Sequence, residues 1–120
     1  MVVFYCNEGG GSPFVDWLGG LPDRARTQCR ARLKLLEARG HELRRPAADY
    51  LRDGIYELRA RAGRVRYRIL YFFQGRETIV VSHGFVKREA AVAAAEIERA
   101  LERKRAFEAN PGQHTYWKLL

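Results

Sequence analysis

Residues 53–73 constrain the fold of this chain more than any other segment, because their side chains alternate between two chemical classes. Two runs rich in β-branched and aromatic residues flank Ala62 and Gly63, which predicts two antiparallel strands joined by a tight turn. If the loop has two or four residues, strand alternation gives the hairpin two faces of different character. One face is apolar, with Tyr56, Leu58, Ala60, Val65, Tyr67, Ile69, Tyr71 and Phe73; the other, here called the arginine face, has Ile55, Glu57, Arg59, Arg61, Arg64, Arg66 and Arg68.

A three-residue loop is disfavoured, because it would place arginines on both faces and bury some of them at a high desolvation cost. We therefore predict a hairpin with one core face and one arginine face. Glu57 is the only acid on the arginine face, so ion pairing within the hairpin leaves several arginines unneutralised. Guanidinium groups match phosphate geometry, which favours a polyanion site; a solvated face with ion pairs is the alternative.

The net charge of the chain agrees with a polyanionic partner. The 120 residues carry a formal charge of +8, which favours nucleic acid, an anionic membrane or an acidic protein. Their composition, 30% charged and 47% hydrophobic, is typical of one folded domain. No apolar run approaches the roughly 20 residues that span a bilayer, and the N-terminus lacks the layout of a signal peptide. We expect a cytoplasmic protein without a membrane partner.

The cysteines and histidines do not suggest a metal or disulfide site. Cys6 and Cys29 are too few for a disulfide framework and are expected to be free, buried thiols. The three histidines, His41, His83 and His114, are far apart, and none is paired with a cysteine at a metal-ligand spacing. We therefore expect neither a metal nor a cofactor.

The segments before and after the hairpin in the sequence predict further strands and helices. Residues 2–6 form a short strand, Ser12 and Pro13 begin a short helix, and a longer helix runs from Pro22 to Gly40. Its arginines are expected to form a solvated face, and residues 41–52 form a connector. After the hairpin we expect a third strand at 77–85, central or covered on both sides, and a helix at 87–109.

These elements predict an α+β fold. Its parts are a small antiparallel sheet (an N-terminal strand, two helices and a three-stranded meander), helices on one face, and a C-terminal helix. The helices would cover the apolar face of the hairpin and leave the arginine face open. We expect one domain over residues 1–109 and a tail over 110–120, which docks on the body or on a second subunit.

Four sequence runs together resemble a known family. Residues 54–59 read Gly-Ile-Tyr-Glu-Leu-Arg, 66–72 read Arg-Tyr-Arg-Ile-Leu-Tyr-Phe, and 83–88 read His-Gly-Phe-Val-Lys-Arg. With Leu-Lys-Leu-Leu-Glu-Ala-Arg-Gly at 33–40, their order and spacing are similar to the phage-derived HigB-like branch of the RelE/ParE toxin superfamily. The resemblance covers roughly residues 2–105. The chain departs from the family at the start of the last helix, where residues 88–92 run on without a Thr-Pro pair.

The resemblance implies a toxin of a type II toxin–antitoxin system. Its relatives cleave mRNA on the ribosome without a metal and are held inactive by an antitoxin, commonly a helix-turn-helix protein. The expected partners are therefore mRNA, the ribosome and a cognate antitoxin. The ParE branch of the superfamily inhibits DNA gyrase instead, so the fold does not fix the target.

The residues permit metal-free RNA cleavage, in which the 2′-hydroxyl attacks the adjacent phosphorus. This chemistry needs cations for the phosphorane charge and groups that transfer protons. We predict phosphate and transition-state binding by Arg59, Arg66 and Arg68, and proton transfer by Lys87 or His83, whose spacing of four places them on one side of a regular strand. A structural role for His83 is the alternative. Further RNA contacts are expected from Arg61, Arg64 and Arg88.

Two other functions fit the same sequence. One is a ParE-like gyrase inhibitor that acts through its basic surface. The other is a non-catalytic nucleic-acid-binding module, whose affinity would fall steeply with salt. An antitoxin would block the arginine face with an acidic or helical segment, or would bind nearby and prevent ribosome entry.

Overall fold

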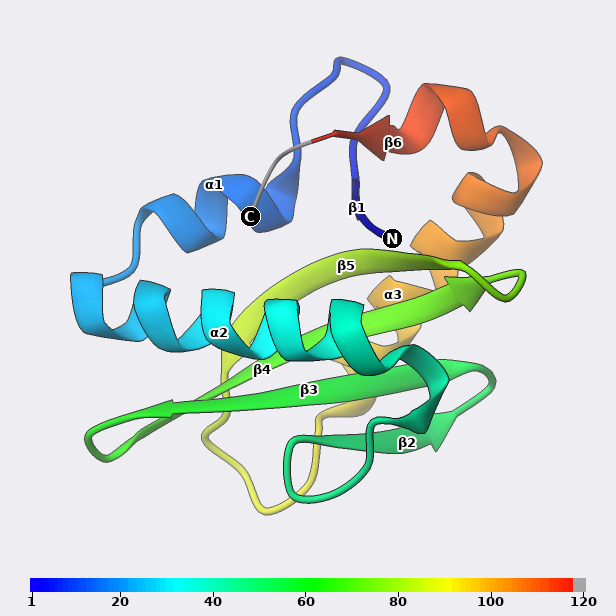
Figure 1. Ribbon diagram of the computed structural model, residues 1–120. Coiled ribbons are helices and arrows are strands. Elements are labelled where there is room, and N and C mark those ends of the chain that lie inside the picture. The colour runs from blue at the N-terminus through cyan, green and yellow to red at the C-terminus, as the bar shows by residue number, and fades with distance from the viewer. Residues whose placement is uncertain (118–120) are drawn as a thin grey trace.

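The computed structural model describes residues 1–117, which form one six-stranded sheet with helices on both faces (Figure 1). The strand order is β2-β3-β4-β5-β1-β6. The predicted α+β class is confirmed. The elements are β1 (Val2–Tyr5), α1 (Pro13–Gly19), α2 (Asp23–Arg39), η1 (Gly40–Glu42), β2 (Ala48–Arg52), β3 (Ile55–Ala62), β4 (Val65–Gln74), β5 (Thr78–Val86), α3 (Ala94–Ala109), η2 (Pro111–His114) and β6 (Thr115–Tyr116).

The β3–β4 hairpin has the predicted segregated register. Ala62 pairs with Val65, so the loop contains Gly63 and Arg64, and Gly63 has a φ of 60° that suits glycine. Upstream of the turn, Arg59 lies opposite Arg68 and Arg61 lies opposite Arg66. The arginines of the two strands therefore share one face, while Arg64 is a turn residue.

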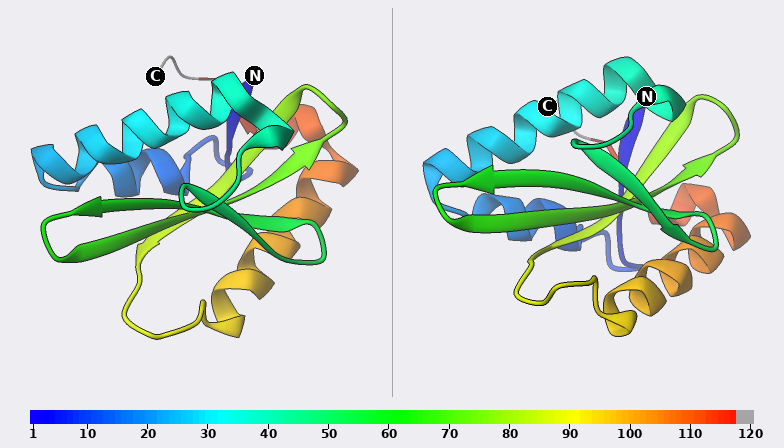
Figure 2. Two further views of the ribbon diagram at one scale, coloured as in Figure 1. Left: turned by 60° about the horizontal axis from the view of Figure 1, so that its bottom comes forward. Right: turned by 90° about the horizontal axis from the view of Figure 1, so that it is seen from below.

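Helices α1 and α2 cover the apolar face of the hairpin (Figures 1 and 2). Ser12 begins α1 by accepting a hydrogen bond from the Val15 amide, as predicted, and α2 buries Cys29 and Leu33. Trp17 of α1 packs so closely on Gly84 of β5 that a Cβ at this glycine would overlap the ring. The main core contains Phe4, Phe14, Leu18, Cys29, Leu33, Leu36, Leu58, Tyr67, Ile69, Tyr71, Ile79 and Val81.

Helix α3 packs on the opposite face of the sheet, which corrects the expectation that the helices lie on one side. Ile97, Ala100 and Phe107 pack with Ile55 and with two residues of β4, forming a second core. The β4 residues are Leu70 and Phe72, which alternation places on the same face as the arginines. Because helices α1 and α2 cover the other face, these apolar side chains are buried only when another helix packs on them. Among residues 1–117, no helix covers the part of this face near the hairpin turn (Figure 2).

The N-terminal strand also differs from the expected antiparallel sheet. β1 runs parallel to β5, with Phe4 opposite Val81, because the two strands are distant in sequence and no hairpin forces them to reverse. β5 lies between β4 and β1 and has buried residues on both faces, which confirms the prediction of a central, doubly covered strand.

Two boundaries differ from the prediction, and the tail takes one of its two predicted positions. Residues 48–52, taken as a connector, form β2, in which Asp49 pairs with Glu57. The last helix begins at Ala94 rather than near Lys87, because the Lys87 amide still donates to the Arg66 carbonyl across the sheet. The tail docks on the body through β6, whose Tyr116 lies opposite Phe4, while residues 118–120 of the predicted tail lie outside the described part.

Both cysteines, Cys6 and Cys29, are free and buried, as predicted. Within residues 1–117, no helix has the length and apolar character needed to cross a bilayer.

Candidate functional site

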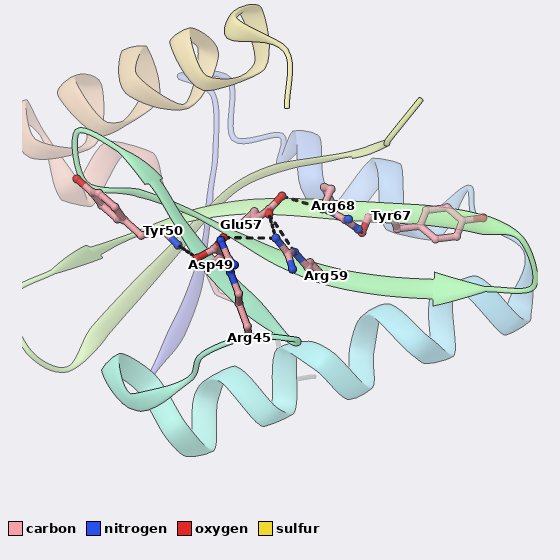
Figure 3. A network of polar contacts seen from close by, with 7 residues as sticks. All are labelled: Arg45, Asp49, Tyr50, Glu57, Arg59, Tyr67 and Arg68. Carbon is pink, nitrogen blue, oxygen red and sulfur yellow. Dashed lines mark hydrogen bonds and ion pairs between the residues drawn. The ribbon is translucent and has the colours of Figure 1, made fainter. Parts of the chain in front are cut away.

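The centre of the arginine face is a buried carboxylate that binds two arginines (Figure 3). Glu57 is only 2% exposed. Its Oε1 accepts a hydrogen bond from Arg68 Nε at 3.1 Å, and its Oε2 accepts from Arg59 Nε at 3.0 Å and from Arg59 Nη2 at 2.8 Å. Such charge-assisted bonds fix the planes of both guanidinium groups.

The strand register explains why these three side chains meet. Arg59 and Arg68 lie directly opposite each other, and Glu57 is two residues before Arg59 on the same face. Without the carboxylate, the two cations would repel each other at a cross-strand distance. Arg68 is 7% exposed and also donates to the Tyr67 carbonyl. Burial lowers the pKa of Arg68, Glu57 partly offsets this, and the guanidinium stays protonated.

A second carboxylate extends this network toward the edge of the sheet. Asp49 of β2 accepts from Arg45 Nε at 2.9 Å and, more distantly, from Arg59 Nη2 at 3.4 Å. The hydrogen bond from Arg45 lowers the pKa of Asp49. The network thus alternates in charge, in the order Arg45, Asp49, Arg59, Glu57 and Arg68. The positive charge of the arginine face is therefore neutralised more than the hairpin sequence alone indicates. The sequence prediction missed Asp49 because it placed this residue in a connector instead of a strand.

Lys87 lies beside the arginines at the end of β5. Val86 pairs with Tyr67, and the Lys87 amide donates to the Arg66 carbonyl at 2.8 Å, so alternation places the Lys87 side chain on the arginine face. Desolvation lowers the pKa of the half-buried Lys87 ammonium group, with a further contribution from Arg68; Glu57 acts in the opposite direction. The neutral amine that a proton acceptor requires is therefore more accessible than in an exposed lysine.

His83 occupies a different environment, although its strand parity is that of Lys87. It is 5% exposed beneath α3, where its Nδ1 lies 2.8 Å from Ser82 Oγ and its Nε2 lies 3.1 Å from Glu96 Oε1. Burial, followed by the charges of Arg103 and Arg99, lowers its pKa to about 3. The imidazole is therefore neutral near pH 7, with a partner at each ring nitrogen. The structure brings Arg59, Arg66, Arg68 and Lys87 together and leaves His83 outside this cluster.

A hollow of about 300 Å³ lies next to the cluster. Its lining includes Arg32 of α2. We predicted that the arginines of this helix form a solvated face, and no sequence pattern within α2 or the hairpin indicates that Arg32 lies near Arg59 and Arg66. Arg64 is exposed in the turn, and Arg88 is exposed in the connector before α3. The residues that line the hollow are Arg32, Pro46, Arg59, Ala60, Arg61, Arg66 and Arg68.

This arrangement can bind anionic oxygens and transfer a proton beside them. Arg66 and Arg61 are exposed and have no carboxylate partner within residues 1–117, so they are the accessible cations. In the same part of the chain, no three histidine, cysteine, aspartate or glutamate side chains are grouped as metal ligands.

Comparison with known proteins identifies the family. No curated protein matches the chain. Residues 16–105 match the family described as "Phage derived protein Gp49-like (DUF891)", and this match includes α2, the hairpin, β5 and most of α3. Because it covers more than half of the 120 residues, the chain belongs to the Gp49-like phage-derived family, within the RelE/HigB-type toxin superfamily.

Proposed function

We propose that this protein is the toxin of a type II toxin–antitoxin system, of the phage-derived HigB-like branch, and acts as a ribosome-dependent, metal-independent mRNA endoribonuclease. Family membership supports a toxin with an antitoxin partner. The observation that carries the catalytic part is Lys87, which lies beside Arg66 and Arg68 on the uncovered part of the sheet. A face that only binds polyanions does not require a lysine with a lowered pKa.

In this proposal the scissile phosphate lies over the hollow. Arg66 and Arg68 bind its non-bridging oxygens and stabilise the charge of the phosphorane, while Arg59 supports Arg68 through Glu57. Lys87, as the neutral amine, accepts the proton of the 2′-hydroxyl when that oxygen forms its bond to phosphorus. The bond from phosphorus to the 5′-oxygen breaks, and water protonates the leaving oxygen. The products are a 2′,3′-cyclic phosphate and a 5′-hydroxyl.

We assign proton transfer to Lys87 in preference to His83. Both nitrogens of His83 already have partners, and the ring is covered by α3, so a nucleotide would have to displace the helix to reach it. Arg61, Arg64 and Arg88 are exposed and contribute peripheral contacts to RNA. The proposed partners are mRNA, the ribosome and a cognate antitoxin, which the resemblance implies to be a helix-turn-helix protein, and the proposed site of action is the cytoplasm.

The test is induction of the protein in cells without the antitoxin, with transcript ends mapped and ribosome dependence measured in a purified translation system. We expect growth arrest and cleaved mRNA from the parent protein. Arg66→Ala and Lys87→Arg should each lower the cleavage rate by about 10²–10³-fold, because they remove a transition-state cation and a proton acceptor. Arg76→Ala, in the β4–β5 turn away from the cluster, is the matched control and should cleave like the parent.

Equal cleavage by the parent and Arg66→Ala would show that the site is wrong. Arrest without any cleaved transcript would contradict the endoribonuclease. A supercoiling assay would then test the ParE-like inhibition of gyrase. Salt-dependent RNA binding without inhibition of gyrase would instead indicate a binding module.

A further inference from the structure

Strand β3 is longer than its neighbour β2, so part of its edge is open. Pairing between the two strands ends where Ala48 lies opposite Leu58, and the Arg59 amide makes one further bond, to the Ala47 carbonyl at 2.8 Å. Backbone groups two residues apart in a strand point to the same edge. The amide and carbonyl of Arg61 therefore face outward beyond the end of β2, where no backbone group of residues 1–117 pairs with them.

The hollow beside this edge is lined from both faces of the sheet. Arg32 and Ala60 belong to the side covered by α2, whereas Arg61 and Arg66 belong to the arginine face. One hollow can contact both sides only if it extends around the edge of the strand. The open edge of β3 and the arginine-lined hollow are thus the same place on the molecule, next to the hairpin that projects beyond β2 in Figure 1.

We propose that an extended, acidic segment of a partner protein adds to this edge as a short strand along residues 59–62. A peptide backbone pairs with the outward amide and carbonyl of Arg61, and RNA has no such ladder of alternating groups. Glutamate or aspartate side chains of the segment pair with Arg61 and Arg66, whose guanidiniums have no carboxylate partner within the described chain.

The geometry also predicts the pattern of the segment. Its side chains alternate between the two faces, so every second residue meets the arginine face and the residues between them meet Ala60 and Arg32. Residues 59–62 span only about 10 Å, so backbone pairing alone is a small contact and the charges are essential. Such a segment would occupy the hollow proposed for the phosphate. Its identification with the antitoxin rests on the proposed function, whereas its binding to the edge does not.

The test uses an end-capped octapeptide of alternating valine and glutamate, measured by calorimetry and by backbone amide NMR shifts. We expect the shifts to map to residues 59–62. The same peptide with N-methyl groups on alternate amides keeps its charge and loses its donors, and it should bind at least about tenfold more weakly. A glutamine–valine peptide should also bind at least about tenfold more weakly, because it lacks the carboxylates.

Two protein variants separate the backbone bond from the charge. Arg61→Ala removes the guanidinium only, and Arg61→Pro also removes the outward amide donor, at an edge position that tolerates proline. Arg61→Pro should bind the octapeptide at least about tenfold more weakly than Arg61→Ala. If Arg61→Pro does not fold, the N-methylated peptide still decides the question.

Equal binding of the methylated and unmethylated peptides would overturn strand addition, and so would amide shifts that map to another edge. Competition with a 2′-O-methyl RNA oligonucleotide tests the shared hollow: bound octapeptide should weaken RNA binding at least about tenfold, and unchanged RNA affinity would refute the shared site. None of these measurements requires cleavage. A protein that binds the peptide as described but cleaves no mRNA would therefore contradict the proposed function and leave the strand addition standing.

Discussion

The face of the sheet opposite α2 has two halves that share the same strands and differ in what covers them. Ile55, Leu70 and Phe72 lie beneath α3 and form a dry core. Nearer the hairpin turn, Arg59 and Arg66 occupy positions that alternation places on the same face. No helix of residues 1–117 covers this end of the hairpin on that face (Figure 2). Strand alternation decides to which face a side chain points, and the path of a distant helix decides whether that face becomes core or site.

His83 and Lys87 show this difference within one segment. They are four residues apart on the same face, yet His83 is enclosed by α3 and bonded at both nitrogens, while Lys87 lies beside the uncovered cations. The connector between β5 and α3 begins at this boundary. β5 and the residue that directly follows it therefore supply a structural histidine and a candidate catalytic lysine.

The largest expected effect contrasts the two halves directly. Phe72→Ala should reduce the free energy of unfolding by about 3–5 kcal/mol, because it leaves a cavity under α3. Arg66→Ala, on the uncovered half, should change it by no more than about 0.5 kcal/mol. Denaturant unfolding measures both. Similar losses from the two variants would mean that the uncovered half is also a packed interior.

A second prediction concerns the buried carboxylate in the uncovered half. Glu57→Gln keeps the size of the side chain but leaves Arg59 and Arg68 without a compensating charge, so it should destabilise the fold by about 3 kcal/mol. Asp49→Asn, at the more exposed end of the network, is the matched control and should cost less than about 1 kcal/mol. If both variants cost the same, Glu57 is not the centre of the network.

The smallest of the three effects depends on pH. The pKa of His83 is about 3 in the fold and near 6.5 in an unfolded chain, so below pH 6.5 the unfolded state binds a proton that the folded state does not. The free energy of unfolding should therefore fall from pH 6.5 toward pH 3, with a loss of about 2 kcal/mol at pH 5. His83→Gln should show a shallower slope than the parent.

An unchanged slope in His83→Gln would place the acid sensitivity elsewhere. The same result would weaken the contrast between the covered and uncovered halves, because it would mean that α3 does not keep solvent and protons from His83.

Much of the hairpin could be predicted from the sequence, since parity and the cost of burying arginine fix its register. The sequence also contains a sign that another element covers Ile55 and Leu70. Strand alternation places both side chains on the arginine face, and they are too apolar to be left exposed to water. The first residue of α3 was predicted too early, because the alanine-rich stretch before Ala94 has a high helix propensity. In the structure, the hydrogen bond from the Lys87 amide to the Arg66 carbonyl keeps the beginning of this stretch extended.

The candidate site was predicted less completely than the fold. Strand alternation was enough to place the arginines on one face. Their charge is partly neutralised by Asp49, which lies in β2. This segment forms a strand because it pairs with β3, and its own sequence gives no clear strand pattern. Arg32 reaches the same hollow from α2, and no periodicity within either segment connects them. Whether His83 faces a substrate or a helix was equally a matter of packing between segments distant in sequence.

The pairing of β1 has a consequence for synthesis of the chain. The neighbours of β1 in the sheet are β5 and β6, and β5 is distant from β1 in the sequence and ends at Val86. β1 therefore has no strand partner until the segment that forms β5 has left the ribosome, and such long-range closure slows folding. Lys87 reaches its place beside Arg66 only when β5 joins the sheet, so a nascent chain cannot assemble the candidate site before the segment through Lys87 has been made and released from the ribosome.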